Sequence, residues 1–175
     1  MGAFSGLKDA SRAYQSNALQ AGKYVTRIDE CAFFDSAKGE MWKNTLTILA
    51  IDASTGPTQH KVGEVVNTFF KVQTGAGGRN TFQGNLKGFL AGVLGVEDSA
   101  IGEAEAAQAC SDQSPMKGLV TVVTARRVVS QKTKDAVTGQ PVSYVVYSWS
   151  QLLDSAQITA ALPAEDLKRF FPNGL

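Results

Sequence analysis

Two long stretches near the start of the chain have the hydrophobic pattern of β-strands. Residues 24–34 are rich in β-branched and aromatic side chains, which suit a pleated, half-buried surface. Residues 41–51 alternate polar and apolar side chains and then become apolar. The polar residues 35–40 between them include Gly39, which can adopt the positive φ that a hairpin turn or bulge needs. The pattern therefore predicts a hairpin of two long strands.

The rest of the chain predicts three more strands and several helices. Strand-like stretches rich in β-branched and aromatic residues occur at residues 62–72, 118–130 and 142–150. The Gly, Pro, Ser and Thr content of loops marks residues 53–60, 73–81 and 131–141. From Asn85 the apolar period becomes helical, and its apolar face is Leu86, Phe89, Leu90, Val93 and Leu94. Short helices are also expected at about residues 101–109 and 164–170.

The resulting order of elements is β-β-β-α-β-β. This is the order of the OB-fold, a small, partly open Greek-key barrel of five strands. We therefore predict a mostly β protein, with an OB-fold-like barrel over residues 22–152. Residues 1–21 are expected to be a flexible N-terminal arm, and residues 153–175 a C-terminal helical extension. In this fold the second and third strands, with the 1–2 and 4–5 connections, bind oligonucleotides.

The net charge of +1 hides an uneven distribution along the chain. Residues 22–96 and 117–150, which form the predicted barrel, contain thirteen Lys and Arg but seven Asp and Glu. The segment between them is acidic. A basic barrel suits a polyanionic partner, while a solvated surface of mixed charge accounts for the same residues equally well.

Residues that could support catalysis or metal binding are scarce. The one histidine, His60, lies in a Gly-Pro loop and is expected to be solvated. Cys31 and Cys110 belong to no metal or redox spacing, and we expect them to be free thiols. No nucleophile motif and no converging set of carboxylates is apparent. We therefore predict that the protein is not an enzyme and uses no metal or cofactor.

The chain also lacks the patterns of membrane and secreted proteins. It has no apolar run of about 18 residues, which a membrane span would need. The first residues lack the basic and apolar regions of a signal peptide. We therefore expect a cytoplasmic protein that does not interact with membranes.

Cations beside aromatic rings recur on the strands and connections that the predicted fold would use for binding. Cations bind the phosphates of a single strand, and aromatic faces stack on its bases. We predict a nucleic-acid site made of these residues: Arg27, Lys38, Trp42, Lys43, Phe70, Lys71, Arg79, Arg126, Arg127, Lys132, Lys134, Tyr144, Tyr147 and Trp149.

The strand period leaves alternatives open at several of these positions. Neighbours on a strand point to opposite faces, so only one residue of an adjacent pair can face a groove. This applies to the pairs Phe69–Phe70 and Arg126–Arg127. Trp42 shares its face with apolar residues of its strand, so a core position and a stacking position are equally expected. Tyr144 lies on the face opposite Tyr147 and Trp149, so one of these two sets is buried.

Three segments resemble a family of small tailed-phage proteins that are similar to single-stranded DNA-binding proteins. They are GKYVTRIDE (22–30), SAKGEMW (36–42) and NLKGFLAGVLG (85–95). The resemblance covers roughly residues 22–95, with a looser match through the fourth and fifth strands. It implies an OB-fold protein that coats single-stranded DNA during phage replication or recombination. The chain departs from bacterial single-stranded DNA-binding proteins because it lacks their long acidic C-terminal tail.

We therefore expect sequence-independent binding and protection of single-stranded DNA in the host cytoplasm. A homo-oligomer is expected, with replication or recombination proteins as possible partners. The alternative is a non-catalytic β-barrel module that binds another protein, such as a recombination or host factor. A metal-dependent nuclease is a third possibility.

Overall fold

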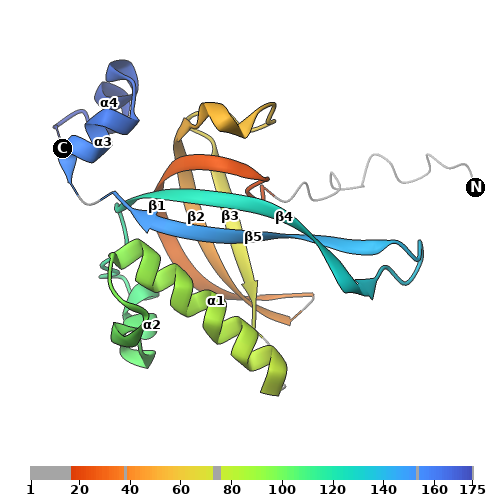
Figure 1. Cartoon of the computed structure of the whole chain (residues 1–175). Coiled ribbons are helices and arrows are strands. Elements are labelled where there is room, and N and C mark those ends of the chain that lie inside the picture. The colour runs from red at the N-terminus through yellow and green to blue at the C-terminus, as the bar shows by residue number, and fades with distance from the viewer. Residues whose placement is uncertain (1–16, 38, 73–75, 153, 175) are drawn as a thin grey trace, which may run out of the picture.

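A computed structural model describes residues 17–37, 39–72, 76–152 and 154–174, and only the backbone of residues 76–80. The described residues form one antiparallel sheet of five strands: β1 (Gly22–Ser36), β2 (Gly39–Ile51), β3 (Val65–Lys71), β4 (Val120–Lys134) and β5 (Pro141–Gln151). Its helices are α1 (Ala76–Leu94), α2 (Glu103–Ala109), α3 (Ser155–Ala161) and α4 (Ala164–Phe170). The strand order across the sheet is β3-β2-β1-β4-β5 (Figure 1).

This architecture confirms a mostly β protein with five strands and a helix between the third and fourth. The predicted closure into a barrel is not confirmed, because β3 and β5 are the two edges of an open sheet and no pairing joins them in the described chain. Other parts of the chain occupy this space instead. Phe89 of α1 packs against Phe70 of β3 and Trp149 of β5. Leu19, which precedes β1, is also buried in the same core.

The predicted hairpin of β1 and β2 is present, both strands are longer than the predicted residues 24–34 and 41–51, and the hairpin is strongly curved (Figure 1). Its register shifts twice, between Val25 and Thr26 and between Ile28 and Glu30. Such irregularities increase the local twist and bend a strand. Gly39 has a φ of 99° at the tight turn, as predicted, in a region that side chains rarely enter.

The sheet is covered on both faces at one end, which explains why the adjacent Ile48 and Leu49 are both buried. Ile48 belongs to the main core on the inner face, together with Trp42 and Phe89. Leu49 lies on the outer face in a second cluster, where Leu162 and residues of α3 and α4 cover it. The C-terminal helices are therefore packed on the sheet, at the end away from the β4–β5 hairpin (Figure 1).

Helix α1 crosses the open side of the sheet and packs against β5 (Figure 1). This close approach requires a glycine, because a Cβ at Gly92 would lie 2.5 Å from the carbonyl oxygen of Trp149. The helix begins at Ala76, so the loop predicted for residues 73–81 is wrong from residue 76 onward. The glycines in that stretch favour a loop by local propensity, which the rest of the helix outweighs.

Two further differences concern the second half of the chain. Strand β4 continues to Lys134, through residues that the polar composition assigned to a loop. A helix that the sequence did not predict, α3, begins after Asp154, whose side chain accepts a hydrogen bond from the Gln157 N–H at 2.8 Å. This is the usual N-cap contact of a helix.

Candidate nucleic-acid interface

A cleft of about 750 Å³ lies between the two edge strands, where a closed barrel would have its last strand pairing. Its walls are residues 69–71 of β3 and residues 144–149 of β5, and α1 forms its floor. The lining is rich in aromatic rings: Phe69, Phe70, Phe82, Phe89, Tyr144, Tyr147 and Trp149. Lys71 is exposed at its edge. An apolar cleft with a cation at its mouth suits a ligand that has flat rings and negative charge.

The rings inside the cleft form one packed group. Phe89 and Trp149 meet edge to face with their centroids 4.8 Å apart, and Tyr147 lies 6.1 Å from Trp149. Burial raises the pKa of Tyr147 to about 12, because the charged phenolate is poorly solvated there. Its hydroxyl donates to the carbonyl oxygen of Leu19 at 3.5 Å. Tyr147 and Trp149 are thus half-buried residues of the cleft wall, with one side against the core.

Tyr144 occupies the opposite face of β5, as the strand period predicts. It pairs with Val128 of β4 and is 50% exposed. It is also among the residues that line the cleft. Tyr144 is therefore the most accessible of the predicted stacking residues on β5.

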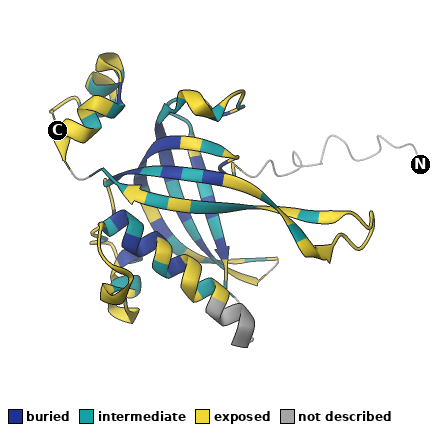
Figure 2. Cartoon of the chain, viewed as in Figure 1, coloured by how far each residue is buried: buried dark blue, intermediate teal, exposed yellow. Residues whose placement is uncertain are grey.

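The β4–β5 hairpin extends away from the body of the molecule and is mostly exposed (Figures 1 and 2). Four predicted cations lie on it, all exposed: Arg126, Arg127, Lys132 and Lys134. None of them forms an ion pair with a residue that the structure describes. Several cations without acidic partners on a protruding hairpin are typical of a surface that binds a polyanion.

The one acid among the hairpin's described residues, Asp135, is hydrogen-bonded within the turn. The Asp135 carboxylate accepts hydrogen bonds from the backbone N–H groups of Val137 and Thr138 and from the Thr138 hydroxyl. These bonds stabilise the charged form and lower the pKa of Asp135. The carboxylate therefore serves the turn and is not paired with the neighbouring cations.

Arg126 and Arg127 point to opposite faces, as expected. Arg127 pairs with Val145 and continues the row of Ala125, whose side chain is buried in the core. It therefore lies on the inner side of the sheet, just where the core ends. Arg126 pairs with Val146 on the outer side. The two guanidinium groups border the hairpin's base on both faces.

The predicted cations of β1 and β2 have partners instead. The Arg27 Nε donates to the carboxylate of Asp29 at 3.0 Å, and the Lys43 Nζ lies 3.5 Å from Glu30 Oε2. The outer face of these strands thus has balanced charge. A polyanion approaching it would have to displace the carboxylates, so Arg27 and Lys43 are weaker candidates than the hairpin cations.

The base-stacking role predicted for two of the aromatic residues is wrong, because both are buried. Trp42 is 0% exposed, and its Nε1–H donates to Asn44 Oδ1 at 2.6 Å inside the core. Phe70 is 7% exposed and packs against Phe89. Strand alternation places both on the inner face. Phe69, which the prediction left out, is the outward member of its pair, and its ring lies 5.9 Å from that of Phe34.

Two predicted cations cannot be placed. Lys38 lies outside the described residues, and only the backbone of Arg79, in α1, is described. Their participation in the site stays a prediction.

The described residues contain no group of three or more His, Cys, Asp or Glu placed to hold a metal ion. Cys31 and Cys110 are free thiols there, and burial raises the pKa of Cys31 to about 12. In the same residues, no helix has the length and apolar character to cross a membrane.

Comparison of the chain with models of protein families and with curated protein sequences finds no match. The resemblance to the tailed-phage family therefore stays a prediction.

Proposed function

We propose that this protein binds single-stranded DNA without sequence preference, through the cleft between β3 and β5 and the cationic β4–β5 hairpin. The observation that supports this most is that the cationic hairpin and the aromatic cleft share strand β5. Four cations that have no ion-pair partner among the described residues lie on β4, and its hairpin partner β5 forms one wall of the cleft lined by aromatic rings. The cations would hold successive phosphates, and rings at the mouth such as Tyr144 would stack on bases.

The energies of such contacts are sufficient for useful affinity. Stacking on an exposed ring contributes about 1–3 kcal/mol per base. Each phosphate neutralised on a single strand contributes about 0.7 to the slope of log affinity against log salt concentration. Binding by this site requires no catalysis, so the proposal is for a binding protein that protects its ligand during replication or recombination.

The assignment of the sheet to the OB-fold is part of the same proposal. We infer a variant of the OB-fold in which Leu19 and α1 take the place of β3–β5 pairing. The strand order and the helix between β3 and β4 support it. The phage origin, the host cytoplasm and a homo-oligomeric state belong to this proposal as well.

A fluorescence-anisotropy titration of labelled oligo(dT) tests the function. We expect binding at about 50 mM salt that weakens steeply by about 200 mM, through release of counterions. Lys132→Gln/Lys134→Gln should lower the salt slope by about 1.4, since two phosphate contacts are lost.

The matched control for this titration is Lys117→Gln/Lys168→Gln, which removes two exposed lysines outside the hairpin. It should leave the slope unchanged. Equal effects of the two double variants would point to net charge rather than to the hairpin. No binding of the wild type at low salt would overturn the proposal.

A second function is favoured by the open edge of β5. An extended peptide can add to a free sheet edge through backbone hydrogen bonds. A protein partner whose binding to the purified chain resists nuclease treatment and is unaffected by oligo(dT) would support this alternative over DNA binding.

A further inference from the structure

Residues 17–21 close one end of the gap between β3 and β5. The Asn67 N–H of β3 donates to the Asn17 carbonyl at 2.7 Å, and the Leu19 N–H donates to the Asn67 carbonyl at 3.0 Å. The Leu19 side chain is 1% exposed in the core. The hydroxyl of Tyr147, from β5, donates to the Leu19 carbonyl. This short segment therefore bridges the two edge strands.

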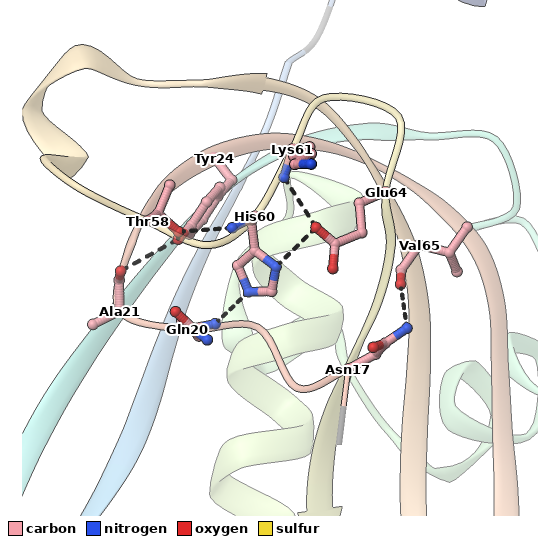
Figure 3. A network of polar contacts seen from close by, with 9 residues as sticks. All are labelled: Asn17, Gln20, Ala21, Tyr24, Thr58, His60, Lys61, Glu64 and Val65. Atoms are coloured by element: carbon pink, nitrogen blue, oxygen red, sulfur yellow. Dashed lines mark hydrogen bonds and ion pairs between the residues drawn. The ribbon is translucent and has the colours of Figure 1, made fainter. Parts of the chain in front are cut away.

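A buried histidine holds the segment in place (Figure 3). The Gln20 N–H donates to the Nε2 of His60 at 3.0 Å. His60 is 7% exposed, so the expectation of a solvated loop residue is wrong. Its ring meets Tyr24 edge to face at 5.8 Å. Because Nε2 accepts a hydrogen bond, this arrangement requires a neutral ring with its proton on Nδ1.

The other ring nitrogen faces a carboxylate. His60 Nδ1 lies 3.2 Å from Glu64 Oε2, within ion-pair distance (Figure 3). The Glu64 oxygen is not in line with the Nδ1–H bond, so no hydrogen bond forms between them. Nδ1 is therefore buried without a hydrogen-bond partner in the described chain. Glu64 Oε2 is held there by the Lys61 N–H, which donates to it at 2.9 Å. A full positive charge on the ring would strengthen this pairing.

The other ionisable groups that the structure describes around the ring do not compete for the proton. The Tyr24 hydroxyl is bonded to the Ala21 carbonyl and lies within hydrogen-bond distance of Thr58 Oγ1. Lys61 is exposed to solvent. The guanidinium of Arg169, from α4, lies beside Gly63. Within the part of the chain that the structure describes, Glu64 is thus the charged group that faces His60.

Protonation would convert Nε2 from an acceptor into a donor. Its new N–H would face the Gln20 N–H, and two donors cannot bond to each other. The imidazolium would at the same time be drawn to Glu64. The two changes act in the same direction, away from Gln20.

We propose that His60 is a pH-sensitive latch for residues 17–21. The neutral imidazole holds the Gln20 N–H, and the imidazolium releases it and pairs with Glu64. Release loosens the segment at the Leu19 end of the cleft when the ring gains a proton as the pH falls. The latch does not depend on the function proposed above.

Amide hydrogen exchange measured by NMR tests the latch in the full chain. We expect the protection factors of Gln20 and Leu19 to fall about 3- to 10-fold as the His60 ring titrates, which is the effect of losing one hydrogen bond. The Ile28 amide, which donates to the Leu119 carbonyl within the sheet, is the internal reference and should not change.

Two variants separate the latch from a general effect of acid. His60→Gln keeps an acceptor that does not titrate, so its Gln20 protection should be independent of pH. Glu64→Gln removes the carboxylate that attracts the imidazolium, so the transition should move to lower pH. If His60→Gln does not fold, the wild type and Glu64→Gln decide the matter.

The proposal is overturned by any of three results. The ring of His60 gains a proton while Gln20 protection stays constant, the ring stays neutral at every pH at which the protein is folded, or His60→Gln shows the same fall in protection.

Discussion

The body of the sheet and the β4–β5 hairpin contain the same residue types side by side, and the structure uses them in opposite ways. In the body, Trp42 is buried and its neighbour Lys43 is paired with Glu30. On the hairpin and its base, Tyr144 is half exposed and Arg126 has no acidic partner in the described chain. Both regions are antiparallel strands with the same alternation of faces.

The difference arises from what surrounds each strand pair. The body strands are covered by α1 on one face and by the C-terminal helices on the other, at one end. Acidic side chains of β1 lie next to the cations there. Beyond Ala125 most residues of the hairpin are exposed, and its one acid in the described chain is Asp135, which is bonded within the turn. An aromatic ring and a cation therefore stabilise the fold in the first region and are free to bind a ligand in the second.

The largest effect expected from this comparison is on Trp42. Trp42→Ala should lower the free energy of unfolding by about 5 kcal/mol, since it empties a large core site and leaves Asn44 Oδ1 without its donor. Tyr144→Ala should cost about 0.5 kcal/mol or less. Urea denaturation of both variants checks this. Similar losses would show that the two regions do not differ as described.

Phe70 and Phe69 offer the same contrast on adjacent residues. Phe70→Ala should destabilise by about 3–4 kcal/mol, because its ring packs in the core. Phe69→Ala should cost about 1 kcal/mol. Under the proposed function the order reverses for oligo(dT), where loss of the Phe69 ring should weaken binding about tenfold. An unchanged affinity of Phe69→Ala would remove this ring from the site.

The alkaline limit of stability tests Tyr147. Its pKa is raised from 10.0 to about 12 by burial, so the folded protein keeps the phenolic proton after the unfolded chain has lost it. The resulting stabilisation is complete below pH 10 and is lost as the pH rises through about 12, amounting to about 3 kcal/mol. Denaturant melts at several alkaline pH values should show this loss. Tyr147→Phe should abolish this alkaline loss of stability, whereas Tyr144→Phe should leave the loss unchanged.

The smallest effects concern the cations. Lys43→Gln should cost less than about 1 kcal/mol, because its ion pair with Glu30 is partly exposed. Lys132→Gln should change stability by about 0.5 kcal/mol or less. In oligo(dT) binding, Lys132→Gln should reduce the salt slope by about 0.7, and Lys43→Gln should reduce it less. An equal reduction by both would mean that the Glu30 pair does not restrict Lys43.

The sequence by itself determined the order of strands along the chain, the helix between the third and fourth strands and the turn at Gly39. It also determined the alternation of faces along each strand. These features depend on residues close together in the chain, since the period of two and the conformational freedom of glycine are local properties. The period also required one of Phe69 and Phe70 to be buried, without indicating which.

Only the tertiary structure decided which face is the inside, because that depends on where α1 and the C-terminal helices pack. It placed Trp42 and Phe70 in the core and Phe69 outside. It paired Lys43 with Glu30, thirteen positions earlier, and His60 with Gln20, forty positions earlier. It also left the sheet open between β3 and β5. Such contacts join residues distant in sequence, so no local pattern records them.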